Sequence, residues 1–582
     1  MVRIIHEWNG ERAEEEATGL GAGMFLLPGK EAFFSLGGVT KYNGLLHLQQ
    51  DRLVRSIENI FLQGELSTVR TAPGAVERRY TSGAMELFRM RGPCLQYEVT
   101  DYQGEVFLDL DMRRLDDSDT RGRVYDVRIE NGAVSITYTK YTDDSCAAKE
   151  YSLTLTVAGA VPASFRRIGE WQERRYAYDA RRGDSAVAWV YRAGAFKTDG
   201  VLTLTFILDG SQSKGGEVEI PPGPLPAAVA LASLDGLVTT EGFIMAGLPW
   251  FCQPWSRDEL VSLGAFIRAR RYSFAKATIL RYAALLEKKA TLDAYYPSGG
   301  LTAADARGWL ALRTHQLLST LEEQRLLGDY FSKRELELLR DRIVGAMHKQ
   351  GLCESGLCLN GPCETWMDTN WGGDTREGAR LEIQALRATG FRLCHYLFRK
   401  THLLSSWKCR EQYEAFLRTF HDAFFVDGRL CDGVKDGARD ETQRPNVFLA
   451  YYLAPELLLP AEWKSAFDSA LSRLWLPWGG LATIDMESPL FAPRYTGMDN
   501  RSYHRGDSWY WLNAVAAMAM KRLDAVKYGA YIDKIRAACV NDMLFQGVVG
   551  HCSELSSAAE QEWGGCFSQA WSAAMLYELL ME

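Results

Sequence analysis

The sequence predicts two domains of different class, an N-terminal antiparallel β-sandwich followed by a helical domain. Apolar residues alternate with polar ones through the first two hundred residues, whereas spacings of three and four dominate after about residue 255. A glycine- and proline-rich stretch separates the two patterns. At 582 residues the chain is also too long for one compact core. We therefore expect a multidomain β + α protein.

The strands of the first domain are predicted from period-two alternation. It is clear in Val134 to Tyr138, Leu153 to Val157 and Leu202 to Phe206. Turn signals at Asn131-Gly132 and Gln103-Gly104 punctuate such runs. One apolar face per strand favours stacked antiparallel sheets, hence a β-sandwich.

The domain boundary is predicted in Ser211 to Pro226, where glycine and proline disfavour regular structure and polar residues favour solvent. We place the N-terminal domain at 1–225 and the second domain at 226–582.

The second domain shows helical periodicity. Ser332 and Glu335 form a capping-box pattern that starts one such stretch. Gly-, Trp- and Asp-rich loops separate the helices, which suggests helical hairpins packed around a common axis. The expected helical stretches are 308–327, 334–349, 379–399, 407–423, 510–523 and 568–580.

Composition excludes several classes of function. The formal net charge is -8, and no long basic run could follow a phosphate backbone, so nucleic acid is not an expected partner. Residues Met1 to Glu16 lack the apolar centre of a signal peptide, and no stretch is long enough to span a membrane. We expect a cytoplasmic protein without a metal site, in which the twelve cysteines are small buried hydrophobes.

Tryptophan marks the second domain as the one that binds a ligand. Thirteen of the sixteen tryptophans lie from Trp250 onward, many of them in polar loops beside arginine and carboxylates. Flat apolar rings next to hydrogen-bonding groups suit the faces and hydroxyls of pyranose sugars. The alternative is that each tryptophan simply packs in the hydrophobic core. For any single tryptophan, this interpretation is at least as probable as a role in sugar binding.

Sugar chemistry directs attention to the acidic residues of this domain. Glycoside hydrolysis needs one protonated carboxyl to give a proton to the leaving oxygen and a second, ionised, carboxyl. Composition cannot choose among the candidates, which are Glu364, Asp368, Asp374, Glu554, Glu560 and Glu562.

Several segments resemble the glycogen-debranching amylo-α-1,6-glucosidases of bacterial and archaeal type, which are similar to glucoamylases in fold. A weaker match lies at Thr40 to Leu46, where Asn43 replaces the usual His. The stronger matches, in chain order, are Gly247 to Phe251, Trp255 to Asp258, Thr365 to Asp368, Leu381 to Leu386, Arg444 to Asn446, Tyr503 to Gly506 with Trp509, and Ser568 to Ser572.

The resemblance implies that the helical domain is an (α/α)6 toroid with its catalytic carboxyls at one mouth. It places Asp368 as general acid and Glu554 as general base. For Asp368 the alternative is a cap of backbone N–H groups. For Glu554 the alternative is that it is an exposed loop carboxylate without a catalytic role, in which case Glu560 or Glu562 would be the base. The substrate-binding residues implied are Trp250, Phe251, Trp255, Arg257, Asp258, Trp366, Glu382, Arg444, His504, Trp509, Gln569 and Trp571.

The function that the resemblance implies is inverting, exo-acting removal of α-1,6-linked glucose from branch stubs of glycogen or maltodextrin. The carboxylates supply the proton transfers, so no cofactor is expected. The expected partner is a branched glucan, with neither nucleic acid nor membrane. The alternatives are an α-1,4-glucosidase or trehalase-like enzyme on the same toroid, or a catalytically silent glucan-binding protein.

Overall fold

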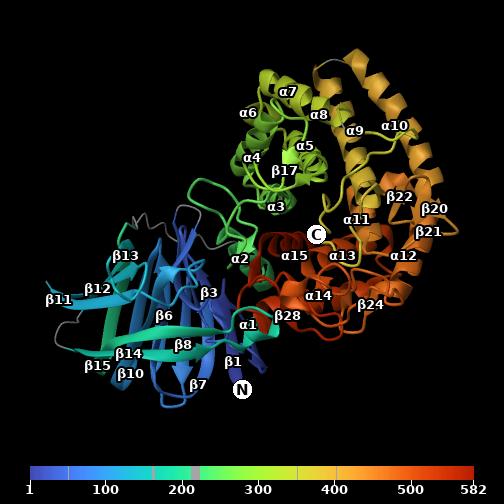
Figure 1. Ribbon diagram of the computed structural model, residues 1–582. Coiled ribbons are helices and arrows are strands. Elements are labelled where there is room, and N and C mark those ends of the chain that lie inside the picture. The colour runs from blue at the N-terminus through green and yellow to red at the C-terminus, as the bar shows by residue number, and fades with distance from the viewer. Residues whose placement is uncertain (50–51, 131, 160–163, 211–222, 350, 402) are drawn as a thin grey trace. The chain divides into compact units, whose positions relative to one another are not determined.

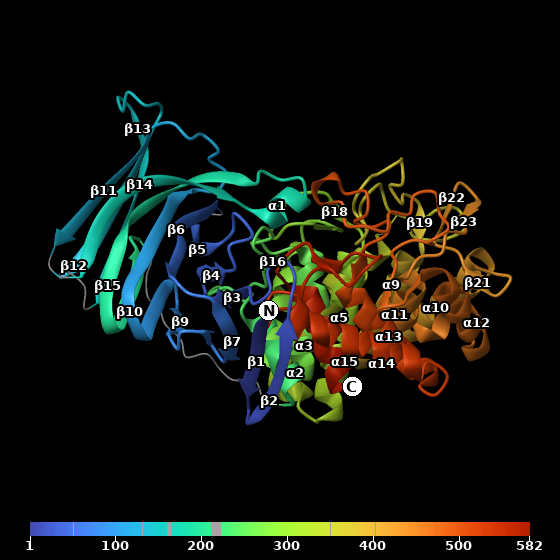
Figure 2. The same cartoon turned by 90° about the horizontal axis from the view of Figure 1, so that it is seen from below.

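A computed structural model describes residues 1–49, 52–130, 132–159, 164–210, 223–349, 351–401 and 403–582 (Figures 1 and 2). The chain divides into two compact units. The first comprises Met1–Thr240 with Asn541–Cys552, and the second comprises Glu241–Val540 with Ser553–Glu582. Most of the predicted boundary segment, residues 211–222, lies outside the described part of the chain.

The first unit is mostly β. Fifteen of the described strands form one branched sheet in which β10 and β15 pair with each other and each with further strands. The first half of β10 pairs with β9 and the second half with β6, while β15 pairs with β14 and then with β13. The strands are β1 (Val2–Trp8), β2 (Glu11–Ala17), β3 (Phe25–Pro28), β4 (Ala32–Leu36), β5 (Gly44–Gln49), β6 (Arg52–Leu62), β7 (Leu66–Ala72), β8 (Ala75–Tyr80), β9 (Met85–Arg91), β10 (Cys94–Arg114), β11 (Arg123–Glu130), β12 (Ala133–Tyr141), β13 (Lys149–Gly159), β14 (Phe165–Arg175) and β15 (Val187–Leu208).

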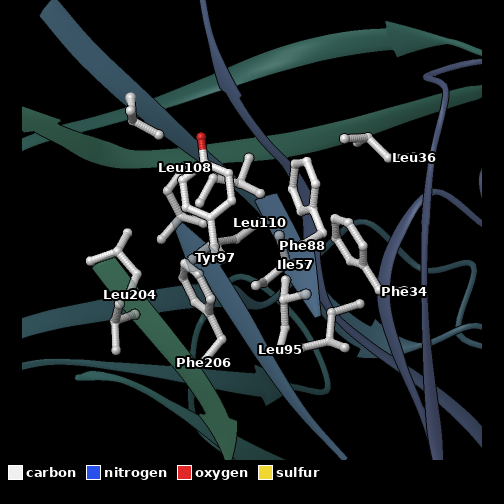
Figure 3. Close-up of a cluster of buried hydrophobic side chains, with 14 of the residues drawn as sticks. Phe34, Leu36, Ile57, Phe88, Leu95, Tyr97, Leu108, Leu110, Leu204 and Phe206 are labelled. Atoms are coloured by element: carbon white, nitrogen blue, oxygen red, sulfur yellow. The ribbon is translucent and has the colours of Figure 1, made fainter. Parts of the chain in front are cut away.

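The alternating residues of these strands form the core of the first unit. Val134, Ile136 and Tyr138 of β12 are all fully buried, as the period-two pattern predicts. Side chains from both branches of the sheet meet in one cluster, where Phe88 of β9 lies 5.3 Å from Phe34 of β4 between ring centres (Figure 3). Burying each such side chain contributes roughly 1.5–3 kcal/mol, so the alternation largely determines this half of the fold.

One of the two predicted turns is wrong. Gln103 and Gly104 lie inside β10, which passes a register shift between Val99 and Tyr102 and then continues. The irregularity is a β-bulge-like break, which a turn signal alone does not distinguish from a chain reversal. The other predicted turn includes Asn131, which lies outside the described residues.

The second unit is helical, and six of its helices close a ring (Figure 1). Each of α3, α5, α9, α11, α13 and α15 packs against the next, and α15 packs against α3. The ring helices are α3 (Ser256–Arg268), α5 (Ala306–Glu323), α9 (Leu381–Thr401), α11 (Asn446–Leu453), α13 (Tyr510–Asp524) and α15 (Ala570–Met581).

Further helices pack on the ring or lie between its members in sequence. In this group α4 contacts α3 and α5, α10 contacts α9, and α12 contacts α11 and α13. Their bounds, with those of two short helices of the first unit, are α1 (Ala177–Arg181), α2 (Leu225–Asp235), α4 (Tyr272–Leu285), α6 (Leu327–Tyr330), α7 (Lys333–Leu339), α8 (Gly345–His348), α10 (Leu403–Phe424), α12 (Pro460–Leu474) and α14 (Gly529–Asn541).

All six predicted helical stretches are present, with ends that differ by up to about four residues. The capping box at Ser332 and Glu335 is confirmed, since each side chain bonds the backbone of the other residue. Helices α3, α4, α11, α12 and α14 of the second unit were not predicted. Helix α11 is buried on every side, which leaves no one-sided pattern to detect. Helix α12 was missed although it buries one apolar face that includes Trp463 and Phe467.

Short strand pairs join distant parts of the second unit. Strand β16 (Gly247–Leu248) pairs with β29 (Ser568–Gln569), and Gly247 lies so close to Gln569 that a Cβ would be 2.2 Å from Oε1. A three-stranded sheet consists of β26 (Ser508–Trp509), β27 (Leu555–Ser556) and β28 (Trp563–Gly564). These pairings bring the start and the end of the unit to one place.

The cysteines differ in two respects from the expectation that all are small buried hydrophobes. Cys394 of α9 and Cys409 of α10 form a disulfide. Cys146 is exposed, and Cys252, Cys353 and Cys363 are half-buried. Within the described residues, no helix has both the length and the apolar character needed to cross a bilayer.

Candidate active site

A cavity of about 210 Å³ opens where several ring helices begin. Arg257 and Asp258 line it from the first turn of α3, Trp509 from the residue before α13, and Trp571 from the first turn of α15. Asp368 lines it from the loop between α8 and α9, and Glu554 from the residue before β27. The two carboxyls named from the resemblance therefore share one cavity.

Asp368 is the more accessible of these two carboxyls. Its side chain is 28% exposed and accepts a hydrogen bond from Nη1 of Arg257 at 3.1 Å. Burial raises the pKa of Asp368 above its usual value, and the nearby guanidinium offsets part of this rise. A carboxyl with a raised pKa can hold a proton closer to neutral pH, as a general acid must.

Arg257 joins Asp368 to a second buried carboxyl. Its Nε donates to Oδ2 of Asp305 at 2.5 Å. Burial raises the pKa of Asp305 to about 6 and that of Asp258 to about 8. For Asp258 the negative charges of Asp368 and Glu554 add to the rise, while Arg257 opposes it. The single positive charge of Arg257 thus lies near the carboxyls of Asp258, Asp305 and Asp368, which cannot all be ionised together.

Glu554 is 1% exposed and is held by donors on both carboxyl oxygens. The hydroxyl of Tyr503 donates to Oε1, and the backbone N–H of Cys566 donates to Oε2 at 2.8 Å. Burial and the charge of Glu554 raise the pKa of Tyr503 well above 10, so the phenol remains a donor. Hydrogen bonds of this kind stabilise a carboxylate, as a general base requires.

The alternative bases lie elsewhere. Glu560 and Glu562 are exposed residues of the segment between β27 and β28, and neither lines the cavity.

Aromatic rings form much of the cavity wall. Trp366, Trp509 and Trp571 pack edge to face, with centroids 5.7 Å apart for the first two and 5.6 Å for the last two. Trp571 also stacks at 4.9 Å on the buried Trp511 behind it. Phe251, Trp255 and Tyr503 complete the aromatic lining, and Gln569 lies beside Asp258. A rigid set of rings with a few polar groups is typical of a sugar pocket.

Three residues that the resemblance names for substrate binding lie instead behind the loop that carries Asp368. Arg376 donates to Thr365 of this loop and pairs with Glu382 through both carboxyl oxygens, at 2.6 and 3.0 Å. Arg444 contacts the sulfur of Met367 at 3.7 Å. His504 bonds the hydroxyl of Thr369 at 2.9 Å. Glu382, Arg444 and His504 are buried and do not line the cavity.

Trp250 does not line the cavity either and packs edge to face on Phe567. Conversely, sequence reasoning did not name Ala246, Thr369, Asn500 and Tyr503, which do line it. Tyr503 was within reach, because it precedes His504 in a matched segment. Asn500 has a left-handed backbone at φ 56°, which no pattern in the sequence indicated. In the described residues, no three His, Cys, Asp or Glu side chains form a group that could hold a metal ion.

The amylo-alpha-1,6-glucosidase family matches residues 231–578, which include every residue of this cavity. The chain belongs to this family. Its members are glycoside hydrolases, and the matched region covers more than half of the chain. No curated protein matches the sequence.

Solved structures support the fold of this family member. A bacterial glucoamylase, solved in complex with acarbose, is similar over 99% of this chain and 96% of its own, with a TM-score of 0.64 and 10% identity. At this identity the likeness shows the glucoamylase-like fold alone. A GH63 mannosylglycerate hydrolase from Thermus thermophilus, solved with glucose, covers 61% of this chain and 100% of its own at 13% identity. Its TM-score is 0.45.

Proposed function

We propose that this chain is an inverting, exo-acting glycoside hydrolase that removes α-1,6-linked glucose from branch stubs of glycogen or maltodextrin. The observation that carries the proposal is the single tryptophan-walled cavity lined by both Asp368 and Glu554. Membership of the amylo-alpha-1,6-glucosidase family supports the choice of linkage.

In the proposed mechanism Asp368 protonates the glycosidic oxygen as the bond from C1 to that oxygen breaks. Glu554 takes a proton from a water molecule whose oxygen attacks C1 from the opposite face of the ring. The products are a sugar with inverted configuration at C1 and the shortened glucan. Such chemistry needs carboxyls roughly 6.5–9.5 Å apart so that the water fits between them.

Two observations support the exo mode of action: the size of the cavity, and the difference in solvent exposure between Asp368 and Glu554. About 210 Å³ is less than the roughly 300–1,000 Å³ of pockets for drug-sized ligands, and suits one sugar ring. Asp368 is more exposed than Glu554, which puts the acid on the side from which the remaining polymer leaves. A terminal glucose then occupies the deeper part, beside the base.

Polar groups in the cavity wall suit the hydroxyls of that glucose. Arg257, Asp258 and Gln569 lie close together, and a guanidinium beside a carboxyl discriminates well between hydroxyl orientations. The substrate is neutral, so the net charge of -8 does not oppose its binding.

The architecture belongs to the same proposal. We propose that the closed ring of six helices, with its outer helices, is an (α/α)6 toroid, and that the two branches of the N-terminal sheet form a β-sandwich. The contacts from α3 round to α15 support the first, and the shared core of both branches supports the second.

The test is glucose release from a limit dextrin by the full chain, with Asp368→Asn, Glu554→Gln and, as a matched control, the exposed Glu560→Gln. We expect both cavity variants to lose turnover by orders of magnitude while sugar binding survives, and the control to remain active. Retained turnover in both cavity variants would overturn the residue roles.

The linkage is tested separately with small substrates. Release of glucose from panose or isomaltose should exceed release from maltose and trehalose. Equal or faster turnover of maltose or trehalose would replace the proposed linkage with one of the alternatives, and no turnover of any substrate would favour a silent glucan-binding protein.

A further inference from the structure

A second cavity of about 380 Å³ lies in the helical unit, lined from α5, α9 and α10. It shares no residue with the cavity of Asp368 and Glu554. Its volume falls within the roughly 300–1,000 Å³ of small-molecule pockets. Neither the hydrolase mechanism nor the support of its loops uses this second cavity, which we call the basic cavity.

Positive charge distinguishes the basic cavity. Arg392, Arg399 and Arg410 line it, and two of them already have carboxylate partners. Arg392 lies 3.4 Å from Glu456, and Arg410 pairs with Glu414 along α10 at 2.9 Å. Arg399 makes no direct ion pair in the described part of the chain, although its charge interacts with that of Glu322, which pairs with Lys400. The guanidinium of Arg399 therefore has no carboxylate in direct contact, and an anion could take that place.

Two histidines add neutral donors to this set. His315 and His395 both line the basic cavity. Burial, together with the charge of Arg392, lowers the pKa of His315 to about 4, so the imidazole is neutral at physiological pH. Neither imidazole has a hydrogen-bond partner among the described residues. A neutral imidazole can donate one bond and accept another, so it can serve an oxygen-rich ligand without adding charge.

The rest of the lining is aromatic. Phe391 of α9 stacks on Tyr413 of α10 with ring centres 5.3 Å apart, and Tyr396 packs edge to face with His315 at 5.5 Å. These rings offer an apolar surface next to the guanidinium groups. A bare inorganic anion would leave that surface unused, whereas a ligand with a ring could cover it.

We propose that the basic cavity binds a phosphate ester of a sugar ring, either a free sugar phosphate or a nucleotide. Planar guanidinium groups match phosphate oxygens in pairs and are the preferred partners of phosphate in proteins. The phosphate lies among the arginines, with Arg399, which makes no direct ion pair in the described residues, as its main partner, and the ring lies against the aromatic side chains. The aromatic wall beside the arginines distinguishes this cavity from a solvated cluster of surface arginines.

The basic cavity is also separate from the catalytic one along α9. The first turn of this helix carries Glu382, which supports the loop of Asp368, whereas Arg399 lies near its end. From Leu381 to Arg399 the helix rises about 27 Å at 1.5 Å per residue. A ligand in the basic cavity therefore does not compete with a sugar beside Asp368, and this inference does not depend on the proposed hydrolase function.

The experiment is calorimetric titration of the full chain with inorganic phosphate, glucose 6-phosphate, AMP and glucose. We expect at least one ester to bind at least tenfold more tightly than inorganic phosphate. Comparing the affinities for glucose 6-phosphate and AMP distinguishes a sugar phosphate from a nucleotide as the ligand. The Asp368→Asn variant should bind that ester like the wild type. Saturable binding of neither ester would overturn the proposal. Equal binding of phosphate, or loss of binding in Asp368→Asn, would overturn it as well.

Charge reversal locates the site. Arg399→Glu should weaken ester binding at least tenfold, and because Arg399 is exposed the variant should fold normally. The matched control is Arg418→Glu, which reverses an exposed arginine of α10 outside the cavity. Unchanged binding in Arg399→Glu, or an equal loss in both variants, would show that the ester does not bind in the basic cavity.

Discussion

Gly565 lies directly against the carboxyl of Glu554: a Cβ at position 565 would be 2.2 Å from Oε2. The backbone there is left-handed at φ 69°, so an alanine would meet strain and a clash at once. We expect Gly565→Ala to displace Glu554 and to lower kcat at least about 100-fold, since small misplacements of catalytic groups are costly. Glucose release measures this effect.

The control for this substitution is Gly437→Ala. Gly437 has a similar φ of 79°, but nothing lies within 4 Å of a Cβ at that position. It carries the same backbone penalty without a clash, so its turnover should remain that of the wild type. Equal losses of kcat in the two variants would indicate general strain instead of displacement of Glu554.

Tyr503→Phe removes a hydrogen-bond donor to Glu554 and retains the ring. A hydrogen bond to a charged group is worth roughly 1.5–3 kcal/mol, so we expect kcat to fall about 10- to 100-fold with little change in KM. Tyr528→Phe is the matched control, because it deletes a hydroxyl bonded to Asp468 at 3.0 Å, outside the cavity. Unchanged kcat in Tyr503→Phe would mean that this hydroxyl does not position the base.

Glu382→Ala should act on stability and not on sugar contact. The substitution removes one of the carboxylates that neutralise the buried guanidinium of Arg376. Breaking a buried ion pair lowers the free energy of unfolding by about 3–5 kcal/mol. Urea unfolding measures this loss, and sugar affinity of the folded variant should be unchanged. Glu377→Ala breaks an exposed pair with Lys435 and should cost less than about 1 kcal/mol. A folded Glu382→Ala protein of normal stability that binds sugar poorly would restore Glu382 to the binding site.

The stability of the protein should depend on pH through Asp507. Burial raises the pKa of this carboxyl to about 8 from an ordinary value of 3.8, so the folded state keeps a proton that the unfolded chain has lost. The stabilisation is complete below about pH 4 and is lost as pH rises to 8, by at most about 1.4 kcal/mol per pH unit. We expect Asp507→Asn to flatten the fall in unfolding free energy across this range.

Denaturation between pH 4 and 9 checks the role of Asp507, with Asp422→Asn as control. The side chain of Asp422 is 86% exposed, and its removal should leave the slope unchanged. An Asp507→Asn slope equal to that of the wild type would show that Asp507 titrates normally in the folded protein.

Sequence patterns predicted the β character of the first unit and six helical stretches of the second. They missed α11, which is buried on every side, and also α12, which buries one apolar face. The bulge near Tyr102 carries the same signal as a turn, because both features use small and polar residues.

The candidate site shows a second limit of sequence reasoning. Family resemblance named residues that matter, but could not separate those that line the cavity from those that support its loops. Arg257 and Glu382 occur in motifs of equal strength, yet Arg257 lines the cavity and Glu382 pairs with Arg376 behind the loop of Asp368. Asp305, which pairs with Arg257, lies outside every motif and emerged only from the geometry.

The pairing of β16 with β29 has a consequence for biosynthesis. Gly247 meets Gln569 only after a ribosome has translated more than three hundred intervening residues. A nascent chain can therefore fold its early strands while the helical ring is still open, without Glu554 or Trp571. Ribosome-bound chains that stop before residue 554 should have no hydrolytic activity, so activity should appear only late in synthesis.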